Sequence, residues 1–243
     1  MTSPRFSQVT RQRVFRSASL GGLVFAGATF LAMWLYPGGT ISEPAAEGYR
    51  FGQNFFSDLG RTEDFEGNSN LISMLLFSGG LLTVGCTTAA FFVALPDLFG
   101  GSSRFISVLM TGSGLLAGIG FFGIAITPWD LMREAHDFCV NLGFRSLLLA
   151  CLAAMANIYR TRSFPNGFGH LMVLVSAILL GYILLLQFGP SVSTPRGLMI
   201  QVGGQKVVAY VLVGGITALA FGASRVNQQV GHLDQRIGST EEA

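Results

Sequence analysis

The 243-residue chain is poor in charge, and this scarcity sets its class. Only 12% of the residues are Asp, Glu, Lys or Arg, whereas 50% are hydrophobic and the mean hydropathy is +0.54. Soluble domains carry about 25% charged residues. The composition therefore argues against an ordinary soluble domain and indicates an integral membrane protein.

Cysteine and familiar enzyme motifs are also scarce. Cys86, Cys139 and Cys151 lie in apolar runs without CxxC spacing, which predicts buried thiols and no metal centre. The net charge of +2 comes with scattered arginines, so no nucleic-acid-binding patch is expected. The sequence contains no GxSxG elbow, HExxH helix or Walker loop. We therefore predict no nucleic-acid partner, metal or cofactor, and an enzymatic role stays uncertain.

Long apolar runs dominate what remains. Six segments approach the ~20 residues that cross a bilayer as a helix. They span approximately residues 18–36, 71–95, 105–127, 138–158, 170–188 and 207–224. We predict an all-α bundle of six transmembrane helices, preceded by a segment of residues 1–17 and followed by a polar tail of residues 225–243.

The distribution of basic residues predicts the orientation of this bundle. The segments on the side of the two termini hold nine arginines, while the opposite loops hold five basic residues. Basic residues accumulate on the cytoplasmic side of membrane proteins, so the pattern predicts cytoplasmic termini in a plasma membrane. The longer loops, residues 37–70, 128–137 and 189–206, then lie outside, where we expect the functional site.

The stretch of residues 128–145, PWDLMREAHDFCVNLGFR, brings charge into a predicted span. Asp137, Asn141 and Arg145 recur every four residues and would form one stripe of a helix. An arginine inside the membrane costs ~2.5–3.5 kcal/mol, so the stripe is expected to face a protein interior or a wet cavity. Asp137, Asp58 or a lipid phosphate would supply the anionic partner.

Two interpretations of this stretch stay open. In the first, Arg145 pairs with Asp137 and locks the helix to its neighbours. In the second, Arg145 and Asn141 bind the anionic head group of a lipid, because the guanidinium fork suits phosphate. His136 would then transfer protons together with Asp130 or Asp137, since histidine titrates near neutral pH.

Polar residues in the first long loop add to this candidate site. Asn54, Ser57 and Asp58 would share a face of a short helix that ends at Gly60. We expect the aromatic side chains around them to lie at the head-group level of the membrane. These are Tyr49, Phe51, Phe55 and Phe56.

Further polar residues flank the predicted spans. Asn68 and Asn70 are expected to cap the second span. Gln201, Gln205 and Lys206 are expected just before the sixth span and could complete a pocket. The GxxxG pattern of Gly114 and Gly118 predicts close helix packing in the membrane.

The motif NFFSDLG of residues 54–60, the glycine-rich second and third spans, and residues 128–136 carry a resemblance. The chain resembles a bacterial and archaeal group of six-span membrane proteins of unknown function, distantly related to the DRAM and Frag membrane proteins. That resemblance implies lipid handling by analogy. Ser57, Asp58 and His136 are also similar to part of the zinc site of a wider superfamily of seven-span hydrolases, whose further histidines are missing here.

We therefore predict a multi-pass membrane protein whose outer face binds or modifies a lipid head group, with membrane lipids as its partners. The alternatives are a small transporter or proton relay, and a non-catalytic scaffold that packs against a membrane-protein partner or a second copy. The predicted catalytic residues are His136, Asp58 and Asp137. The predicted substrate-binding residues are Arg145, Asn141, Asn54, Ser57 and Asp130.

Overall fold

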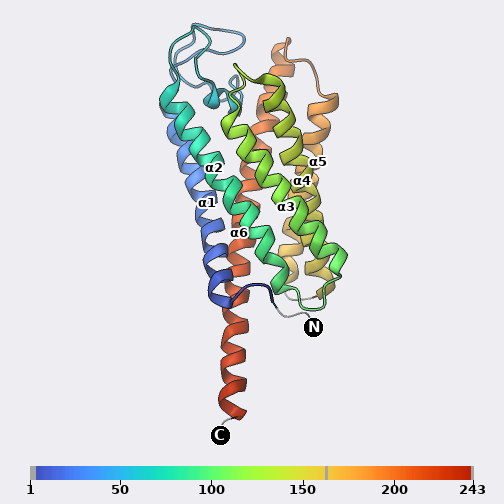
Figure 1. Ribbon diagram of the computed structural model, residues 1–243. Coiled ribbons are helices and arrows are strands. Elements are labelled where there is room, and N and C mark those ends of the chain that lie inside the picture. The colour runs from blue at the N-terminus through green and yellow to red at the C-terminus, as the bar shows by residue number, and fades with distance from the viewer. Residues whose placement is uncertain (1–3, 162–163, 242–243) are drawn as a thin grey trace.

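A computed structural model describes residues 4–161 and 164–241, with side chains as far as residue 231. The chain forms an all-α bundle of long helices (Figure 1). The helices are α1 (Gln8–Trp34), α2 (Leu71–Ala94), α3 (Arg104–Ile126), α4 (Arg133–Thr161), α5 (Asn166–Phe188) and α6 (Pro195–Glu241), with two 3₁₀ turns, η1 (Phe56–Gly60) and η2 (Leu95–Leu98). The six long helices are all long and apolar enough to cross a membrane, which confirms the predicted fold class.

The helices extend beyond the predicted spans. Helix α1 begins at Gln8, where the Ser7 hydroxyl accepts a hydrogen bond from the Thr10 amide at 3.2 Å. Helix α6 begins at Pro195 and continues through the predicted polar tail, so the predicted last loop is mostly helical. Hydropathy detects only the apolar part of a helix, whereas backbone hydrogen bonding continues into polar flanks. The outermost residues of the predicted terminal segments, 1–3 and 242–243, lie outside the described residues.

Glycines allow the helices to approach closely. A Cβ added to Gly118 of α3 would lie 2.6 Å from the Cβ of Ala89 on α2, and one added to Gly114 would collide with Phe92. A Cβ added to Gly120 of α3 would lie 2.5 Å from the Cα of Gly143 on α4. The structure thus confirms that the GxxxG pattern serves helix packing.

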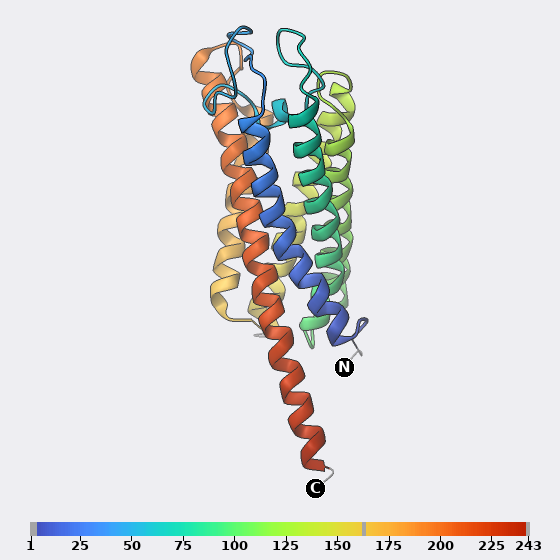
Figure 2. The same cartoon turned by 90° about the vertical axis from the view of Figure 1, so that its left-hand side faces the viewer.

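The two ends of the bundle differ. Both termini lie at one end, and the loop of residues 35–70 covers the other, which we call the loop end (Figure 1). Helices α1 and α6 run side by side (Figure 2). Near the termini, Arg11 Nε on α1 donates to Asn227 Oδ1 on α6 at 2.9 Å, and the Phe6 amide donates to Asp97 at 2.8 Å. Which end is cytoplasmic stays a prediction.

The three cysteines differ in burial. Cys151 is buried and Cys139 is half-buried, but Cys86 is exposed on α2. The prediction of burial is therefore wrong for Cys86. Lipid can cover an apolar helix face as well as protein can, so an apolar run does not imply burial in the protein.

Candidate functional site

The turn η1 inserts an aromatic side chain into the loop end of the bundle. Phe56 is 4% exposed, and its ring centroid lies 5.9 Å from that of Phe25, 5.6 Å from that of Phe77 and 5.6 Å from that of Tyr210. Phe51, by contrast, is 59% exposed. The expectation that all the loop aromatics lie at the membrane surface is thus wrong for Phe56, which anchors the loop in the core.

Four buried polar side chains around η1 form what we call the roof network: Asn54, Asp58, Asn70 and Lys206. Asn54 Nδ2 donates to Asp58 Oδ2 at 3.1 Å, and the Phe55 amide donates to the same oxygen at 2.8 Å. The structure therefore brings together two of the loop residues that the sequence singles out. Burial of this kind is tolerated because the polar atoms are hydrogen-bonded.

Asn70 holds the turn by its side chain. Its Nδ2 donates to the carbonyl oxygens of Leu59 at 3.2 Å and Arg61 at 2.9 Å, and weakly to that of Asp58 at 3.4 Å. Asn70 precedes α2 but makes no side-chain capping bond to it. Asn70 thus occupies the predicted N-cap position, but its side chain does not cap the helix, because the loop folds back over α2 and offers these carbonyls instead.

Lys206 enters the roof network from α6. It is 2% exposed, its Nζ donates to the Asn54 carbonyl oxygen, and it lies 5.3 Å from the ring centroid of Tyr49 and 5.0 Å from that of Phe51. The sequence placed this lysine in an outer loop. Because α6 begins at Pro195, Lys206 instead lies within the helix and faces the protein.

Burial shifts the titration of the one acidic member of the network. Desolvation raises the pKa of Asp58 from 3.8 to about 6. Hydrogen bonds from Asn54 and Phe55, together with the positive charges of Arg61 and Lys206, oppose this rise in the pKa. Asp58 is therefore a carboxyl group whose charge changes within a mildly acidic range.

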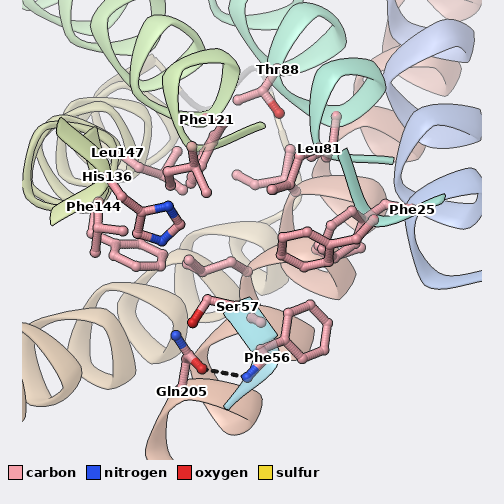
Figure 3. Close-up of a pocket in the computed structure, with 18 residues that line it drawn as sticks. Phe25, Phe56, Ser57, Leu81, Thr88, Phe121, His136, Phe144, Leu147 and Gln205 are labelled. Atoms are coloured by element: carbon pink, nitrogen blue, oxygen red, sulfur yellow. Dashed lines mark hydrogen bonds between the residues drawn. The ribbon is translucent and has the colours of Figure 1, made fainter. Parts of the chain in front are cut away.

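A cavity of about 90 Å³ lies beneath η1, among α1, α2, α3, α4 and α6 (Figure 3). Its polar lining residues are Ser57, Thr88, His136 and Gln205. Figure 3 shows Ser57 and Gln205 together at one edge, with His136 on an adjoining wall. Aromatic and aliphatic side chains form the rest of the wall, among them Phe25, Phe121, Phe144, Leu147 and Leu212. The cavity is thus apolar apart from these few groups.

Two of the polar lining groups are held in place by backbone atoms. Gln205 Oε1 accepts a hydrogen bond from the Phe56 amide at 2.6 Å, so the NH₂ group is the donor end of this side chain. His136 Nδ1 lies 2.7 Å from the Thr127 carbonyl oxygen. Because a carbonyl only accepts, Nδ1 carries the hydrogen, and Nε2 is the acceptor of the neutral ring.

The residues that follow His136 lie outside. Asp137, Asn141 and Arg145, which we call the outer stripe, are at or near the surface of α4. Asn141 Nδ2 donates to the Asp137 carbonyl at 2.9 Å, and Asp137 pairs with Arg133 at 3.8 Å. The prediction of an inward-facing stripe is wrong, because successive helical residues are rotated by about 100° and His136 takes the inward position.

Asp130 also has a different role from the predicted one. Its Oδ2 accepts hydrogen bonds from the Thr62 amide at 2.9 Å and from the Thr62 hydroxyl at 2.6 Å. Asp130 therefore ties the segment before α4 to the first loop. His136 bonds to Thr127, so within the described residues neither Asp130 nor Asp137 is its hydrogen-bond partner.

The structure therefore divides the predicted site residues into two groups. Ser57 and His136 line one cavity, with Asn54 and Asp58 in its roof, whereas Asp137, Asn141 and Arg145 lie on the outer surface. Gln205, which was expected just before the sixth span as a residue that could complete a pocket, also lines the cavity. A scan against family models, a search of curated proteins and a search of solved structures each found no match.

Proposed function

We propose that the protein binds a lipid, with a hydrocarbon chain in the cavity and a polar head beside Ser57, His136 and Gln205. The observation that carries the proposal is the lining of the cavity, which is apolar over most of its wall and polar beneath η1. An apolar chain fills such a space favourably, while a buried polar head needs hydrogen-bond partners.

The polar groups favour an uncharged head. Ser57, His136 and the NH₂ of Gln205 are hydrogen-bonding groups, whereas the charged Lys206 already donates to the Asn54 carbonyl. A hydroxyl, ester or amide would match this set. This revises the anionic head group expected from Arg145 and Asn141, since neither residue lines the cavity.

The size of the cavity favours one chain over a whole lipid. Sites for small molecules commonly enclose about 300–1,000 Å³. The cavity measures about 90 Å³, so it accommodates part of a single chain. The remainder of the ligand would extend between helices toward the bilayer.

Binding has more support than either predicted chemistry. Head-group modification by His136, Asp58 and Asp137 would need these groups to converge, but Asp137 lies on the surface and Asp58 is engaged with Asn54. A relay through Asp137, Asn141 and Arg145 would run along the outside of α4. The resemblance to the DRAM and Frag proteins supports lipid handling by analogy alone.

The proposal can be tested with a photoreactive fatty alcohol in detergent-solubilised protein. Ala209 lines the cavity, and Val207 on the same helix is 55% exposed. Ala209→Phe should lower labelling roughly tenfold, equivalent to about 1.4 kcal/mol, because the ring occupies the chain site. Val207→Phe, the matched control, should label like the wild type. Equal labelling of the two folded variants would overturn the proposal.

The head-group site can be tested separately by comparing the fatty alcohol with an alkane carrying the same photoreactive group. The wild type should prefer the alcohol. His136→Phe keeps an aromatic ring but removes the acceptor, so this variant should lose the preference and still take up the alkane. A preference that survives this substitution would show that His136 does not contact the head.

A further inference from the structure

A groove of about 340 Å³ lies where α1 meets α6, at the end of the bundle that carries both termini. We call it the terminal groove. Figure 2 shows the two helices side by side, with α6 continuing beyond the start of α1. The polar lining residues of the groove are Gln8, Gln12, Arg13, Arg16, Asn227 and Gln228. The cavity beneath η1 lies at the opposite end, so the two sites are independent.

The floor of the terminal groove is held by hydrogen bonds between the two helices. Asn227 is 0% exposed, and its Nδ2 donates to the Gln8 carbonyl oxygen at 3.0 Å. Gln8 Nε2 in turn donates to the Asn227 carbonyl oxygen at 3.1 Å, and Arg11 Nε donates to Asn227 Oδ1. A ligand therefore meets a preformed surface, which lowers the entropic cost of binding.

Two arginines project from one face of α1 into this groove. Arg13 and Arg16 are three positions apart, so they are neighbours on the helix surface, and both are exposed. The donors around Gln12 orient its carboxamide so that the oxygen faces Arg16 Nε at 3.2 Å and Gln228 Nε2 at 2.9 Å. This contact uses one of the five N–H groups of the Arg16 guanidinium.

The described side chains do not neutralise these two charges. Neither Arg13 nor Arg16 forms an ion pair within the described part of the chain. At this end of the bundle the acidic side chain that the structure describes is Asp97. It is buried, accepts from the Phe6 amide and lies 3.5 Å from Arg5 Nε. The terminal groove is thus a concave site of positive potential, which attracts an anion.

The depth of the groove favours an anion that belongs to a lipid. The predicted first span begins at residue 18, so Arg16 and Arg13 precede it by about 3 and 8 Å at 1.5 Å per residue. The head-group layer outside the hydrocarbon is about 5–8 Å thick. Leu20 and Leu23, four and seven residues after Arg16, continue its face toward the membrane and are 61% and 64% exposed. They offer an apolar path for an acyl chain.

We propose that the terminal groove binds the phosphate group of an anionic phospholipid, with its acyl chain along α1. The forked guanidinium groups of Arg13 and Arg16 bind the phosphate oxygens, and the carboxamides of the groove donate to the rest of the head group. The orientation predicted from the basic residues places this end at the cytoplasmic leaflet, which is rich in anionic lipid. A zwitterionic head group is disfavoured, because its own cation would be repelled.

The test is native mass spectrometry of the full chain in detergent, titrated with phosphatidylglycerol or phosphatidylcholine. The wild type should bind one phosphatidylglycerol about tenfold more tightly than phosphatidylcholine, a difference of about 1.4 kcal/mol. Arg13→Gln and Arg16→Gln should each weaken phosphatidylglycerol binding about fivefold, equivalent to about 1 kcal/mol per basic residue. Binding of phosphatidylcholine should not change in either variant. Equal affinities of the wild type for the two lipids would overturn the proposal.

The matched control is Arg104→Gln, because Arg104 is an exposed arginine at the same end of the bundle that does not line the groove. It should keep the wild-type preference for phosphatidylglycerol. A loss as large as that of Arg16→Gln would assign the preference to the general positive charge of this end, and the proposal would fail.

Inorganic phosphate distinguishes a lipid head group from a free anion as the ligand. Millimolar inorganic phosphate should leave phosphatidylglycerol bound to the wild type, since it lacks an acyl chain to contact Leu20 and Leu23. Displacement of the lipid by inorganic phosphate would assign the groove to a soluble anion and overturn the lipid assignment. Labelling of the cavity by the fatty alcohol is independent of all these outcomes.

Discussion

The roof network and the outer stripe are two sets of polar residues near the same end of the bundle, and they differ in what surrounds them. Asn54, Asp58, Asn70 and Lys206 are at most 5% exposed, and they bond to groups from distant parts of the chain. The residues of the outer stripe bond only within α4. Polar residues in a membrane protein therefore do not indicate an interior site until the rotation of their helix is known.

The difference predicts where substitutions matter for stability. A buried polar atom that loses its partner is cut off from water, whereas an exposed one can be solvated again. The roof network should therefore be sensitive to small chemical changes, and the outer stripe should be tolerant of them in detergent solution.

The largest expected effect is the pH dependence due to Asp58. Because burial raises the pKa of Asp58 from 3.8 to about 6, the folded protein binds this proton more tightly than the unfolded chain. The resulting stabilisation is complete below pH 3.8 and is lost as the pH rises through 6. Lowering the pH from 7 to 3.8 should raise the unfolding free energy by about 2.5 kcal/mol relative to Asp58→Asn.

This dependence can be measured by denaturant unfolding in detergent across that range. Ser57→Ala is the matched control, because it changes a neighbouring residue that does not titrate here. It should keep the wild-type slope of stability against pH. If Asp58→Asn kept the wild-type slope of stability against pH, Asp58 would not be the group that causes this slope. The predicted difference in sensitivity between the roof network and the outer stripe would then lose its main support.

The second-largest expected effect is a difference in stability between substitutions of two asparagines, Asn70 in the roof network and Asn141 in the outer stripe. Asn70→Ala removes the hydrogen bonds that Nδ2 makes to the carbonyls around η1, and it should lower the unfolding free energy by about 2 kcal/mol. Asn141→Ala lies in the outer stripe and should change it by less than about 0.5 kcal/mol. Thermal unfolding of both variants in one detergent provides the measurement. Similar losses of stability would remove the distinction between the two regions.

The smallest effect concerns the ion pair of the outer stripe. Arg133 and Asp137 are 71% and 55% exposed at 3.8 Å, so solvent screens their attraction. A double-mutant cycle with Arg133→Gln and Asp137→Asn should give a coupling of about 0.3 kcal/mol that falls in salt. A coupling above about 1 kcal/mol would show that the stripe is more ordered than its exposure implies.

The positions of the six spans and the all-α fold could be predicted from the sequence because they depend on local composition. A run of apolar residues of bilayer length needs no tertiary contact to be recognised. The polar ends of α1 and α6 were not predicted to be helical by this criterion. Residues 8–16 and the residues after Ser224 are helical without being apolar. The turn at residues 56–60 was also foreseen from its polar spacing and from Gly60.

Only part of the candidate site could be found in this way. Ser57, Asp58 and His136 were identified because chemically active groups are rare in this chain. The grouping of His136 with Asp137 failed because neighbours on a helix point in different directions. The burial of Lys206 could not be predicted, because α6 begins at Pro195, before the apolar run. The hydrogen bonds of Asn70 to the carbonyls around η1 could not be predicted either, because they depend on the folding of the loop over α2.

The sequence by itself determined that the chain is a multi-pass membrane protein and which segments span the membrane. A helix that crosses the hydrocarbon core must be apolar over the thickness of that core, and this property is visible in the sequence. Tertiary structure alone decided which polar residues line the cavity and which face outward. The physical reason is that lipid and protein interior are both apolar, so a span such as that of α2 or α4 shows no amphipathic pattern that fixes its rotation. Contacts such as those of Phe56 with Phe25 and Phe77 set that rotation instead.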